Sequence, residues 1–432
     1  MNAIAYPDFI ARRRARVESQ GVQVNPGDLH PSLKPFQHDV TTWAAGVGRP
    51  AVWADTGLGK TRMQLEWSRV MAETSLIVAP LAVGQQTSEE AALINSEARY
   101  VRSGSEIDGP GIYITNYEMV EHFDPSRIGA VALDEASILK QSDGKTRTKL
   151  IQHFRDVPYR STWTATPAPN DPEELTNQAE FLGHMTRTNM LAAYFVHDQD
   201  GWRLKGHAIE PMLDWMSTWA IAIRRPSDLG YSDDGYELPG LNIIPELVDV
   251  HIEPGDGELF AMSIGGVQGR SKVRRESMDA RTARTLELVQ AEPDESWLLW
   301  CGLNDEADAL AEMIPGAVNV HGSMTPEEKA DRLLGFAHGE FRVLVTKLKI
   351  AGLGMNFQRS ARMAFVGLND SYEQYYQGIR RQYRYGQRRV VNAHIVLSQI
   401  ESQIAENVAR KEKQANRVID GLVARNTLRR IA

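Results

Sequence analysis

The sequence has few of the features that mark secreted or membrane-spanning proteins. It contains one cysteine in 432 residues, Cys301, which excludes an internal disulfide and any cysteine-rich zinc site. No run approaches the roughly 20 consecutive apolar residues that span a bilayer, and no apolar signal core follows the N-terminal charges. We therefore expect a cytoplasmic protein that has no membrane segment.

The sequence also lacks an excess of basic residues. It carries 48 Lys and Arg against 56 Asp and Glu, a formal net charge of -8. This balance argues against a protein that coats nucleic acid along its whole surface, but it allows one local basic groove. The hydrophobic fraction of 42% and charged fraction of 24% are ordinary globular values, and the length predicts two or three domains.

Short apolar runs alternate with helical stretches in the first half of the chain, which predicts a parallel α/β sheet. Runs typical of strands buried on both faces lie at 50–55, 75–80, 111–116, 130–135 and 159–167. Between about Asn177 and Arg225 the periodicity turns helical, and one apolar face is expected to point into the core. The residues of this face are Met212, Trp215, Met216, Trp219 and Ile223.

A second alternation follows a polar stretch rich in glycine and proline at 224–240, where we place a domain boundary. Its strand-like runs lie at 296–302, 317–322, 341–346, 362–368 and 392–398, and they predict a second parallel sheet. Cys301 falls in one of them, where we interpret it as a small buried hydrophobic residue. We therefore divide the chain into four parts. A basic N-terminal helix and loop (1–32) precede a first domain (33–225) that contains a helical insertion at about 177–223. A linker (226–240) leads to a second domain (241–432), which ends in a charged helix from about 400 to 428.

The segment "AVWADTGLGKT", residues 51–61, has the order strand, glycine-rich turn and helix start. Such a turn directs backbone N–H groups and the positive end of the helix toward an anion. Gly57 and Gly59 would let the backbone approach phosphates, Lys60 would reach the β- and γ-phosphates, and the Thr61 hydroxyl would bind Mg²⁺. Ala54 replaces the first glycine of the strict phosphate-loop pattern, so an incidental glycine turn is the alternative.

An acidic pair follows the predicted strand at 130–135. Asp134 would hold Mg²⁺ through water, and Glu135 would orient and deprotonate the water that attacks ATP. An isolated Asp-Glu pair would more simply cap the next helix. The buried strand before the pair and the phosphate loop upstream favour the catalytic interpretation.

The segment "TATP", residues 164–167, comes after another predicted strand. Its two threonine hydroxyls could report the state of the γ-phosphate by exchanging hydrogen bonds. A plain turn explains the same residues, and the segment alone does not decide between the two.

The second half carries an arginine-rich segment with interleaved tyrosines, "YYQGIRRQYRYGQRR", residues 375–389. A run of charge is usually a solvated face. Here arginine is used to the exclusion of lysine, and the spacing places Gln377, Arg381 and Arg384 on one face of a helix. An arginine delivered to a γ-phosphate accelerates hydrolysis by about 10³- to 10⁵-fold, so its geometry must be tightly held.

In chain order, "ADTGLGKT", "LDEAS", "TATP", "KIAGLGMNF" and "QGIRRQYRYGQ" resemble motifs I, II, III, V and VI of superfamily 2 helicase-like ATPases. More narrowly, they resemble the Swi/Snf-type DNA translocases, in a compact form similar to proteins carried by bacteriophages and prophages. "LKPFQHDVTTW" resembles the first motif of that family, and "ITNYEMV" its motif Ib. The resemblance covers residues 33 to about 410, and it departs from the usual pattern at Ser137 and Ala165, neither of which predicts a loss of hydrolysis.

The resemblance implies two RecA-like α/β domains in tandem, with ATP and Mg²⁺ as cofactors. On the first domain, Gln37 would read the adenine edge of ATP. The loop residues that would contact ATP are Thr56, Gly57, Leu58, Gly59, Lys60 and Thr61. On the second domain, ATP would contact Gly352 and Gln377. Thr61 and Asp134 would hold the metal, and Lys60, Glu135, Arg381 and Arg384 would be catalytic. The nucleic-acid backbone would meet Thr115, Asn116, Ser323, Thr346 and Lys347 without reading base sequence.

Three functions follow from this interpretation. The first is a DNA-dependent ATPase that moves on double-stranded DNA in phage or bacterial replication, recombination or repair, in the cytoplasm of the bacterium or infected host cell. The second is a strand-separating DNA or RNA helicase, for which we find no convincing wedge hairpin in the sequence. The third is a nucleotide-gated scaffold with negligible turnover, and Glu135 argues against it. The sequence does not indicate a protein partner.

Overall fold

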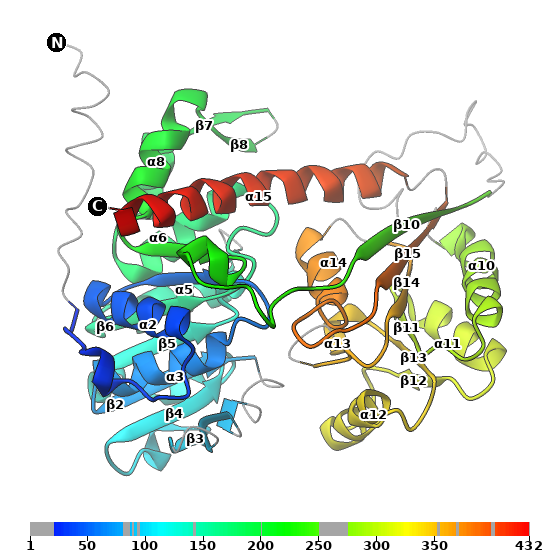
Figure 1. Cartoon of the computed structure of the whole chain (residues 1–432), viewed down its shortest axis with the longest axis horizontal. Helices are drawn as coiled ribbons and strands as arrows, with labels where there is room; N and C mark the ends of the chain where they lie inside the picture. The colour runs from blue at the N-terminus through cyan, green and yellow to red at the C-terminus, as the bar shows by residue number, and fades with distance from the viewer. Residues whose placement is uncertain are drawn as a thin grey trace. The chain divides into compact units, whose positions relative to one another are not determined.

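The computed structural model describes residues 21–80, 87–88, 90–92, 96–140, 144–199, 201–249, 275–351, 355–368, 371–398 and 402–431. The basic helix predicted near residues 9–18 and the nucleotide-contacting position predicted at Gly352 lie outside these ranges. Contacts divide the chain into two compact units (Figure 1): unit 1 comprises Met1–Tyr236 and Lys411–Ala432, and unit 2 comprises Glu237–Arg410. The break after Tyr236 falls within the predicted linker.

Unit 1 is built on a seven-stranded sheet in the order β3-β4-β2-β5-β6-β1-β9. All of its strand pairings are parallel. The strands are β1 (Ala51–Ala54), β2 (Thr74–Ala79), β3 (Ala98–Tyr100), β4 (Gly111–Asn116), β5 (Ala130–Asp134), β6 (Tyr159–Trp163) and β9 (Ala220–Ile223). Because the strands are parallel, all of their carboxyl ends lie at one edge of the sheet, where β6 stands between β1 and β5.

Helices cover both faces of this sheet because its strands are apolar on both sides (Figure 1). Alternate residues of β1 show the division: Val52 packs in the cluster that contains α2 (Pro35–Val47) and α3 (Lys60–Met71). Trp53 packs in the opposite cluster with four further helices. These helices are α5 (Lys145–His153), α6 (Leu175–Leu182), α7 (Arg187–Tyr194) and α8 (Ile209–Met216).

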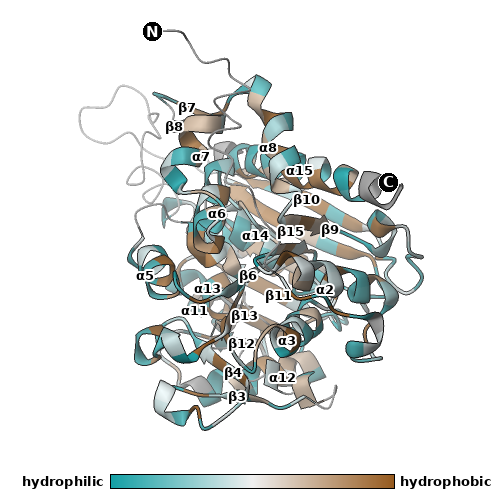
Figure 2. Ribbon diagram, turned by 90° about the vertical axis from the view of Figure 1, so that its left-hand side faces the viewer, coloured by the Kyte–Doolittle hydropathy of each residue, from teal (hydrophilic) through white to brown (hydrophobic). Residues whose placement is uncertain are grey.

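Unit 2 is built on a six-stranded parallel sheet in the order β10-β15-β14-β11-β13-β12. The strands are β10 (Leu241–Val248), β11 (Trp297–Cys301), β12 (Val318–Val320), β13 (Val343–Thr346), β14 (Arg362–Val366) and β15 (Val391–Ser398). Its helices are α10 (Met278–Ala291), α11 (Asn304–Met313), α12 (Pro326–His338), α13 (Leu348–Ala351) and α14 (Tyr372–Ile379). Figure 2 shows hydrophobic residues concentrated on the sheet strands, and Cys301 is buried on β11 as expected. The predicted fold class, two parallel α/β domains in tandem, is confirmed.

The stretch predicted to be helical at 177–223 is only partly so. It contains α7 and α8 but also an antiparallel hairpin, β7 (Phe195–Asp198) with β8 (Gly201–Leu204), and the sheet strand β9. The predicted apolar face is buried at all five positions, although α8 ends at Met216 and Ile223 belongs to β9. The sequence did not predict this hairpin, whose residues Trp202 and Leu204 pack against the core of unit 1.

The C-terminal helix α15 (Ser402–Ile431) packs on unit 1 from Lys411 onward, whereas the sequence-based division placed it wholly in the second domain. Asn426 Nδ2 donates to the carbonyl oxygen of Ala222 on β9 at 2.7 Å. Arg425 forms ion pairs with Glu210 and Asp214 of α8. Among the described helices, none combines the length and apolar character needed to cross a membrane.

Candidate nucleotide site and arginine turn

The loop after β1 has the conformation that a phosphate-binding turn needs. Gly57 and Gly59 adopt φ angles of 87° and 79°, in the left-handed region that favours glycine. Gly59 is the N-cap of α3, so the free N–H groups of this helix point toward the loop. The sequence-predicted order of strand, glycine turn and helix is therefore present in unit 1.

Lys60 is the first residue of α3, and Thr61 is the second. The Lys60 ammonium folds back onto the end of β1, where Nζ donates to the carbonyl oxygens of Ala54 at 2.7 Å and Asp55 at 3.3 Å. Within the loop, the Thr56 backbone N–H donates to the Asp55 carboxylate at 2.6 Å, and the Leu58 side chain is buried. A lysine held above a turn of backbone N–H groups is suited to bind an anion of several charges.

Gln37 connects α2 to the same loop. Its Nε2 donates to the carbonyl oxygen of Leu58 at 2.8 Å, and its Oε1 accepts from the backbone N–H of Lys34 at 2.8 Å. A Cβ atom at Gly59 would lie 2.3 Å from Nε2 of Gln37 and would displace this amide, and the φ of 79° independently favours glycine here. Gln37 thus supports the loop after β1 directly, and the predicted contact with an adenine edge would require its amide to exchange partners.

The acidic pair lies at the carboxyl end of β5, at the sheet edge where the loop after β1 also lies. Asp134 is 8% exposed, and burial, helped by the negative charge of Glu135, raises its pKa to about 7. The positive charge of Lys60 opposes this rise in the Asp134 pKa. The Lys60 ammonium is therefore within electrostatic reach of the Asp134 carboxylate. Tyr117 donates its hydroxyl to the Asp134 carbonyl oxygen at 2.5 Å and fixes the backbone at this position.

Glu135 is the only residue other than glycine with a positive φ, 54°, in the part of the chain that the structure describes. Such a conformation is unfavourable for a residue with a Cβ atom and persists where surrounding contacts enforce it. Its Oε1 accepts from Thr164 Oγ1 at 3.2 Å and from Ser137 Oγ at 3.3 Å. Thr164 directly follows β6, the strand between β1 and β5, so its hydroxyl lies at the same sheet edge as the acidic pair. The "TATP" segment thus supplies a hydrogen bond to this pair.

The residues present fit a magnesium ion bound together with phosphates. The described residues contain no group of three or more His, Cys, Asp or Glu side chains arranged to hold a metal. Mg²⁺ is commonly bound by one or two protein oxygens together with substrate phosphates and waters, so an all-protein cage is not required. The buried Asp134 carboxylate, with its raised pKa, is the kind of oxygen that a divalent cation stabilises in its charged form.

The arginine-rich segment forms a tight turn in unit 2 after α14. Arg381 Nη1 and Arg384 Nη1 both donate to the carbonyl oxygen of Met355, at 3.2 and 3.4 Å. Arg381 Nε donates in addition to the Gln377 carbonyl oxygen at 3.0 Å. The prediction that these arginines share a helix face with Gln377 is wrong, because α14 ends at Ile379. Arg381 and Arg384 instead converge from the following turn on one backbone oxygen, that of Met355.

Buried amides hold this turn from behind, which the sequence-based choice of site residues missed. Gln387 Nε2 donates to the carbonyl oxygens of Gln358, Ser360 and Gln382 at 2.9, 3.0 and 3.2 Å. Its Oε1 accepts from the backbone N–H groups of the next two residues at 2.9 and 3.0 Å. Gln387 ends the segment "QGIRRQYRYGQ" that resembles motif VI, but the motif alone does not indicate that its side chain holds the turn.

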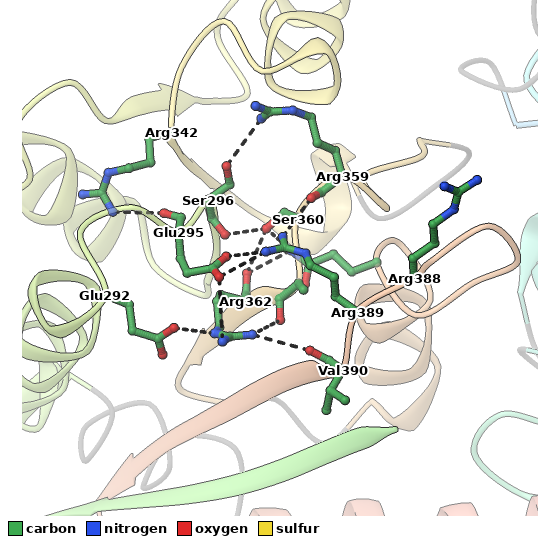
Figure 3. Close-up of polar contacts among 12 residues, drawn as sticks. Glu292, Glu295, Ser296, Arg342, Arg359, Ser360, Arg362, Arg388, Arg389 and Val390 are labelled. Carbon is green, nitrogen blue, oxygen red and sulfur yellow. Dashed lines mark hydrogen bonds and ion pairs between the residues drawn. The ribbon is translucent and has the colours of Figure 1, made fainter. Parts of the chain in front are cut away.

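The remaining arginines of the segment lie away from Met355, and Figure 3 shows two of them, Arg388 and Arg389. Arg389 forms an ion pair with Glu295 at 2.8 Å and donates to the Arg359 carbonyl oxygen at 3.0 Å. Arg388 points away from the other labelled side chains in Figure 3. Arg380 lies over the rings of Tyr376 and Tyr383, at 5.0 and 5.4 Å from their centroids. The arginine run is thus divided between structural anchors and the pair at Met355.

Three of the five predicted nucleic-acid contacts are buried side chains. Thr115 and Thr346 are 0% exposed, and Asn116, at 5%, uses its amide on Tyr100 and on the Met119 backbone. Ser323 is exposed and hydrogen bonds with Nδ1 of His321 at 2.7 Å. Lys347 is partly exposed at the end of β13, so Ser323 and Lys347 are the two predicted positions with accessible side chains.

Comparison with known proteins agrees with the helicase-like interpretation of unit 2. Residues 280–386 match the family described as helicase conserved C-terminal domain, a span that includes the arginine turn. No curated protein sequence matches the chain. Among solved structures, the Sulfolobus solfataricus SWI2/SNF2 ATPase core in complex with dsDNA is similar at 18% identity and a TM-score of 0.44, over 94% of this chain and 97% of that chain.

Proposed function

We propose that this protein is an ATP-hydrolysing motor that moves on nucleic acid, with double-stranded DNA as its track. The observation that carries the proposal is the carboxyl edge of the sheet of unit 1. The loop of Gly57, Gly59 and Lys60 follows β1 there, and the pair Asp134 and Glu135 follows β5, a parallel strand separated from β1 only by β6. The helicase C-terminal match at 280–386 adds the arginine pair of unit 2. Together they supply a phosphate cradle, an acidic pair and cationic side chains, which are the groups that phosphoryl transfer uses.

In this mechanism Lys60 and the loop N–H groups bind the β- and γ-phosphates. Thr61 and Asp134 would hold Mg²⁺, which neutralises charge on those phosphates when it is bound. Glu135 accepts the proton of the attacking water, and its hydrogen bond from Thr164 keeps the carboxylate in one orientation. Arg381 and Arg384 are proposed to stabilise the charge that develops on the γ-phosphate.

The nucleic-acid partner is proposed to be gripped through its backbone, with Ser323 and Lys347 as the accessible candidates in unit 2. The net charge of -8 means that binding depends on local basic groups and weakens strongly as salt rises. The setting that fits a compact translocase is phage or bacterial DNA replication, recombination or repair, in the cytoplasm.

One observation favours the alternative of strand separation. The β7–β8 hairpin stands apart from the main sheet as a two-stranded unit of its own. His197 packs edge-on against Trp202 across it, with ring centroids 4.8 Å apart. Trp202 is partly buried against the core of unit 1, so only part of its ring is accessible to a nucleic-acid strand. A strand-displacement assay with Trp202→Ala, together with the Tm of the variant, would distinguish this alternative from translocation alone.

The test of the proposed chemistry separates ATP binding from turnover. Glu135→Gln keeps the size and hydrogen-bonding capacity of the side chain but removes the base, so we expect ATP affinity within about threefold of the parent and turnover lowered by at least about 10²-fold. Lys60→Ala is expected to weaken ATP binding itself. Fluorescent-nucleotide titration and single-turnover hydrolysis measure the two quantities. Unchanged turnover in Glu135→Gln would remove the catalytic role, and the nucleotide-gated scaffold would then be favoured.

A further inference from the structure

A cavity of about 430 Å³ lies in unit 1 at the amino edge of the sheet. Its walls come from α5, from the start of β6 and from the connection between α6 and α7. The phosphate loop follows the carboxyl end of β1, so the cavity belongs to the opposite edge of the same sheet. It is therefore separate from the nucleotide site described above.

Three arginines line this cavity, and two of them have no ion-pair partner among the described residues. Arg147, Arg155 and Arg160 line it, and Arg147 is paired with Glu180. Among the described residues, no carboxylate lies within ion-pairing distance of Arg155 or Arg160, or of Arg49 nearby. Asp156 acts on Arg160 only at longer range, so this side of the cavity carries positive charge that no direct ion pair neutralises among the described residues.

Arg160 is 4% exposed, which makes its charge expensive to leave unpaired. It donates to the carbonyl oxygens of Arg155 at 2.9 Å and of Phe154 and Leu182 at 3.4 Å, at the ends of α5 and α6. These carbonyl dipoles solvate the guanidinium but carry no net charge. Its Nε has no hydrogen-bond partner among the described residues.

Arg49 and Arg160 are held close to one another at Gly183. A Cβ atom at Gly183 would lie 2.7 Å from Nη2 of Arg160 and 3.0 Å from Nη1 of Arg49. Burial lowers the pKa of both arginines, and the charge of Arg49 contributes to the shift that brings the pKa of Arg160 to about 10. The two guanidinium groups both lie beside Gly183 and repel each other, and an anion between or beside them would relieve this repulsion.

We propose that this cavity binds a small phosphorylated molecule, with its phosphate group on Arg155 and Arg160. Guanidinium groups match phosphate oxygens in geometry and in charge, and such charge-assisted hydrogen bonds are the strong ones. Thr148, Gln152 and Thr186 line the cavity as further polar groups, and Ile151 and Met185 provide an apolar wall for the remainder of the ligand. The volume falls within the range of small-molecule sites, which is more than inorganic phosphate alone requires.

The experiment measures binding of pyrophosphate in the Lys60→Ala variant, so that the phosphate loop does not contribute. Isothermal titration calorimetry at fixed ionic strength gives the Kd, and thermal unfolding gives the saturable rise in Tm that a ligand of the folded state produces. We expect one saturable site whose Kd rises about tenfold or more in Arg155→Ala, because one charge-assisted contact is lost. Arg155 is exposed, so its replacement leaves the ligand-free Tm unchanged.

Arg102→Ala is the matched control, an exposed arginine of unit 1 outside the cavity, and it should leave the Kd unchanged. A rise in Tm that chloride reproduces at equal ionic strength would overturn the proposal. A loss of pyrophosphate binding in Arg102→Ala as large as that in Arg155→Ala would overturn it as well. A third arm replaces pyrophosphate with a short duplex that carries a 5′-phosphate. Binding of that duplex alone, with no binding of pyrophosphate, would also overturn it by assigning the cavity to a nucleic-acid end.

Discussion

At the scale of single residues, the backbone of Glu135 shows how the candidate site is stabilised. A φ of 54° is unfavourable for glutamate, and this conformation directs Oε1 toward the hydroxyls of Thr164 and Ser137. The strain lies next to Asp134, whose buried carboxyl has a pKa near 7. Strained and electrostatically perturbed residues in one place are typical of functional sites.

The bond from Thr164 to Glu135 can be tested separately from catalysis by Glu135 itself. Thr164→Val removes the hydroxyl while preserving shape, so we expect kcat to fall by about 10- to 100-fold with little change in ATP affinity. Thr164→Ser, which keeps the donor, should restore most of the rate. A rate equal to the parent in Thr164→Val would show that the hydrogen bond has no role in turnover.

Gln387 is expected to act through Arg384, because its five hydrogen bonds fix the turn that carries this arginine. Gln387→Ala should lower kcat about as much as Arg384→Ala does, with a smaller effect on the KM for ATP. In a double-mutant cycle the two changes should be far from additive. Additive losses would assign Gln387 a purely structural role, which the Tm of each variant measures independently.

The sequence located the loop after β1 and the acidic pair after β5 because these residues occur in short contiguous motifs, and their role toward a nucleotide stays a prediction. Gly57, Lys60, Asp134 and Glu135 each stand next to the strand that positions them. Gln387 was missed because its partners, Gln358 and Ser360, are distant in sequence. Thr115 and Thr346 were predicted as surface contacts, and their burial depends on packing that a motif does not encode.

At the scale of elements, the junction of α6, α7 and β9 contains a histidine that is neutral in the folded state. His184 Nε2 donates to the Arg49 carbonyl oxygen at 2.7 Å, and its ring stacks on Trp219 with centroids 4.8 Å apart. Burial is the main cause that lowers its pKa to about 4, and the charges of Arg49 and Arg160 add to the shift. Protonation of this ring therefore opposes folding.

The His184 shift predicts how stability depends on pH. The pKa of His184 in the folded state is below its ordinary unfolded value of about 6.5. The contribution of neutral His184 to the free energy of unfolding is therefore fully present above pH 6.5 and is lost as the pH falls toward 4. The loss amounts to about 3 kcal/mol over that range. Urea unfolding of unit 1 followed by tryptophan fluorescence, at pH 7 and pH 4.5, measures it.

His184→Gln is expected to be less stable at pH 7 but to show a weaker pH dependence between 7 and 4.5. The same change at the exposed His207 is the control and should leave the pH dependence of the parent unchanged. A His184→Gln variant whose pH dependence equals that of the parent would mean that another group titrates in this range.

Strand β9 shows where prediction from periodicity fails. Its residues 220–223 are apolar, and the helical spacing of Met212, Trp215 and Met216 continues into them, so the sequence alone favours one helix. In the structure β9 pairs with β1 at every position from Ala51 to Ala54. Strand β10 was also missed, because Pro245 interrupts its pattern; as an edge strand it tolerates the missing N–H group.

At the scale of the whole molecule, the proposed catalytic groups are divided between the two units. The phosphate loop and acidic pair belong to unit 1, and the arginine pair belongs to unit 2. We propose that hydrolysis requires both units, so that nucleic acid held by unit 2 can control turnover at unit 1. With a net charge of -8, that control should depend on a few local contacts and decline steeply with salt.

The most direct test of this account is the steady-state ATPase rate with Mg²⁺ at low salt, measured with no polymer, duplex DNA, single-stranded DNA or RNA. We predict strong stimulation by duplex DNA, loss of that stimulation as salt rises, and no hydrolysis in Lys60→Ala. Greater stimulation by single strands or RNA would support the strand-separating alternative. Absence of hydrolysis under every condition would contradict the central claim that the protein is an ATP-driven motor.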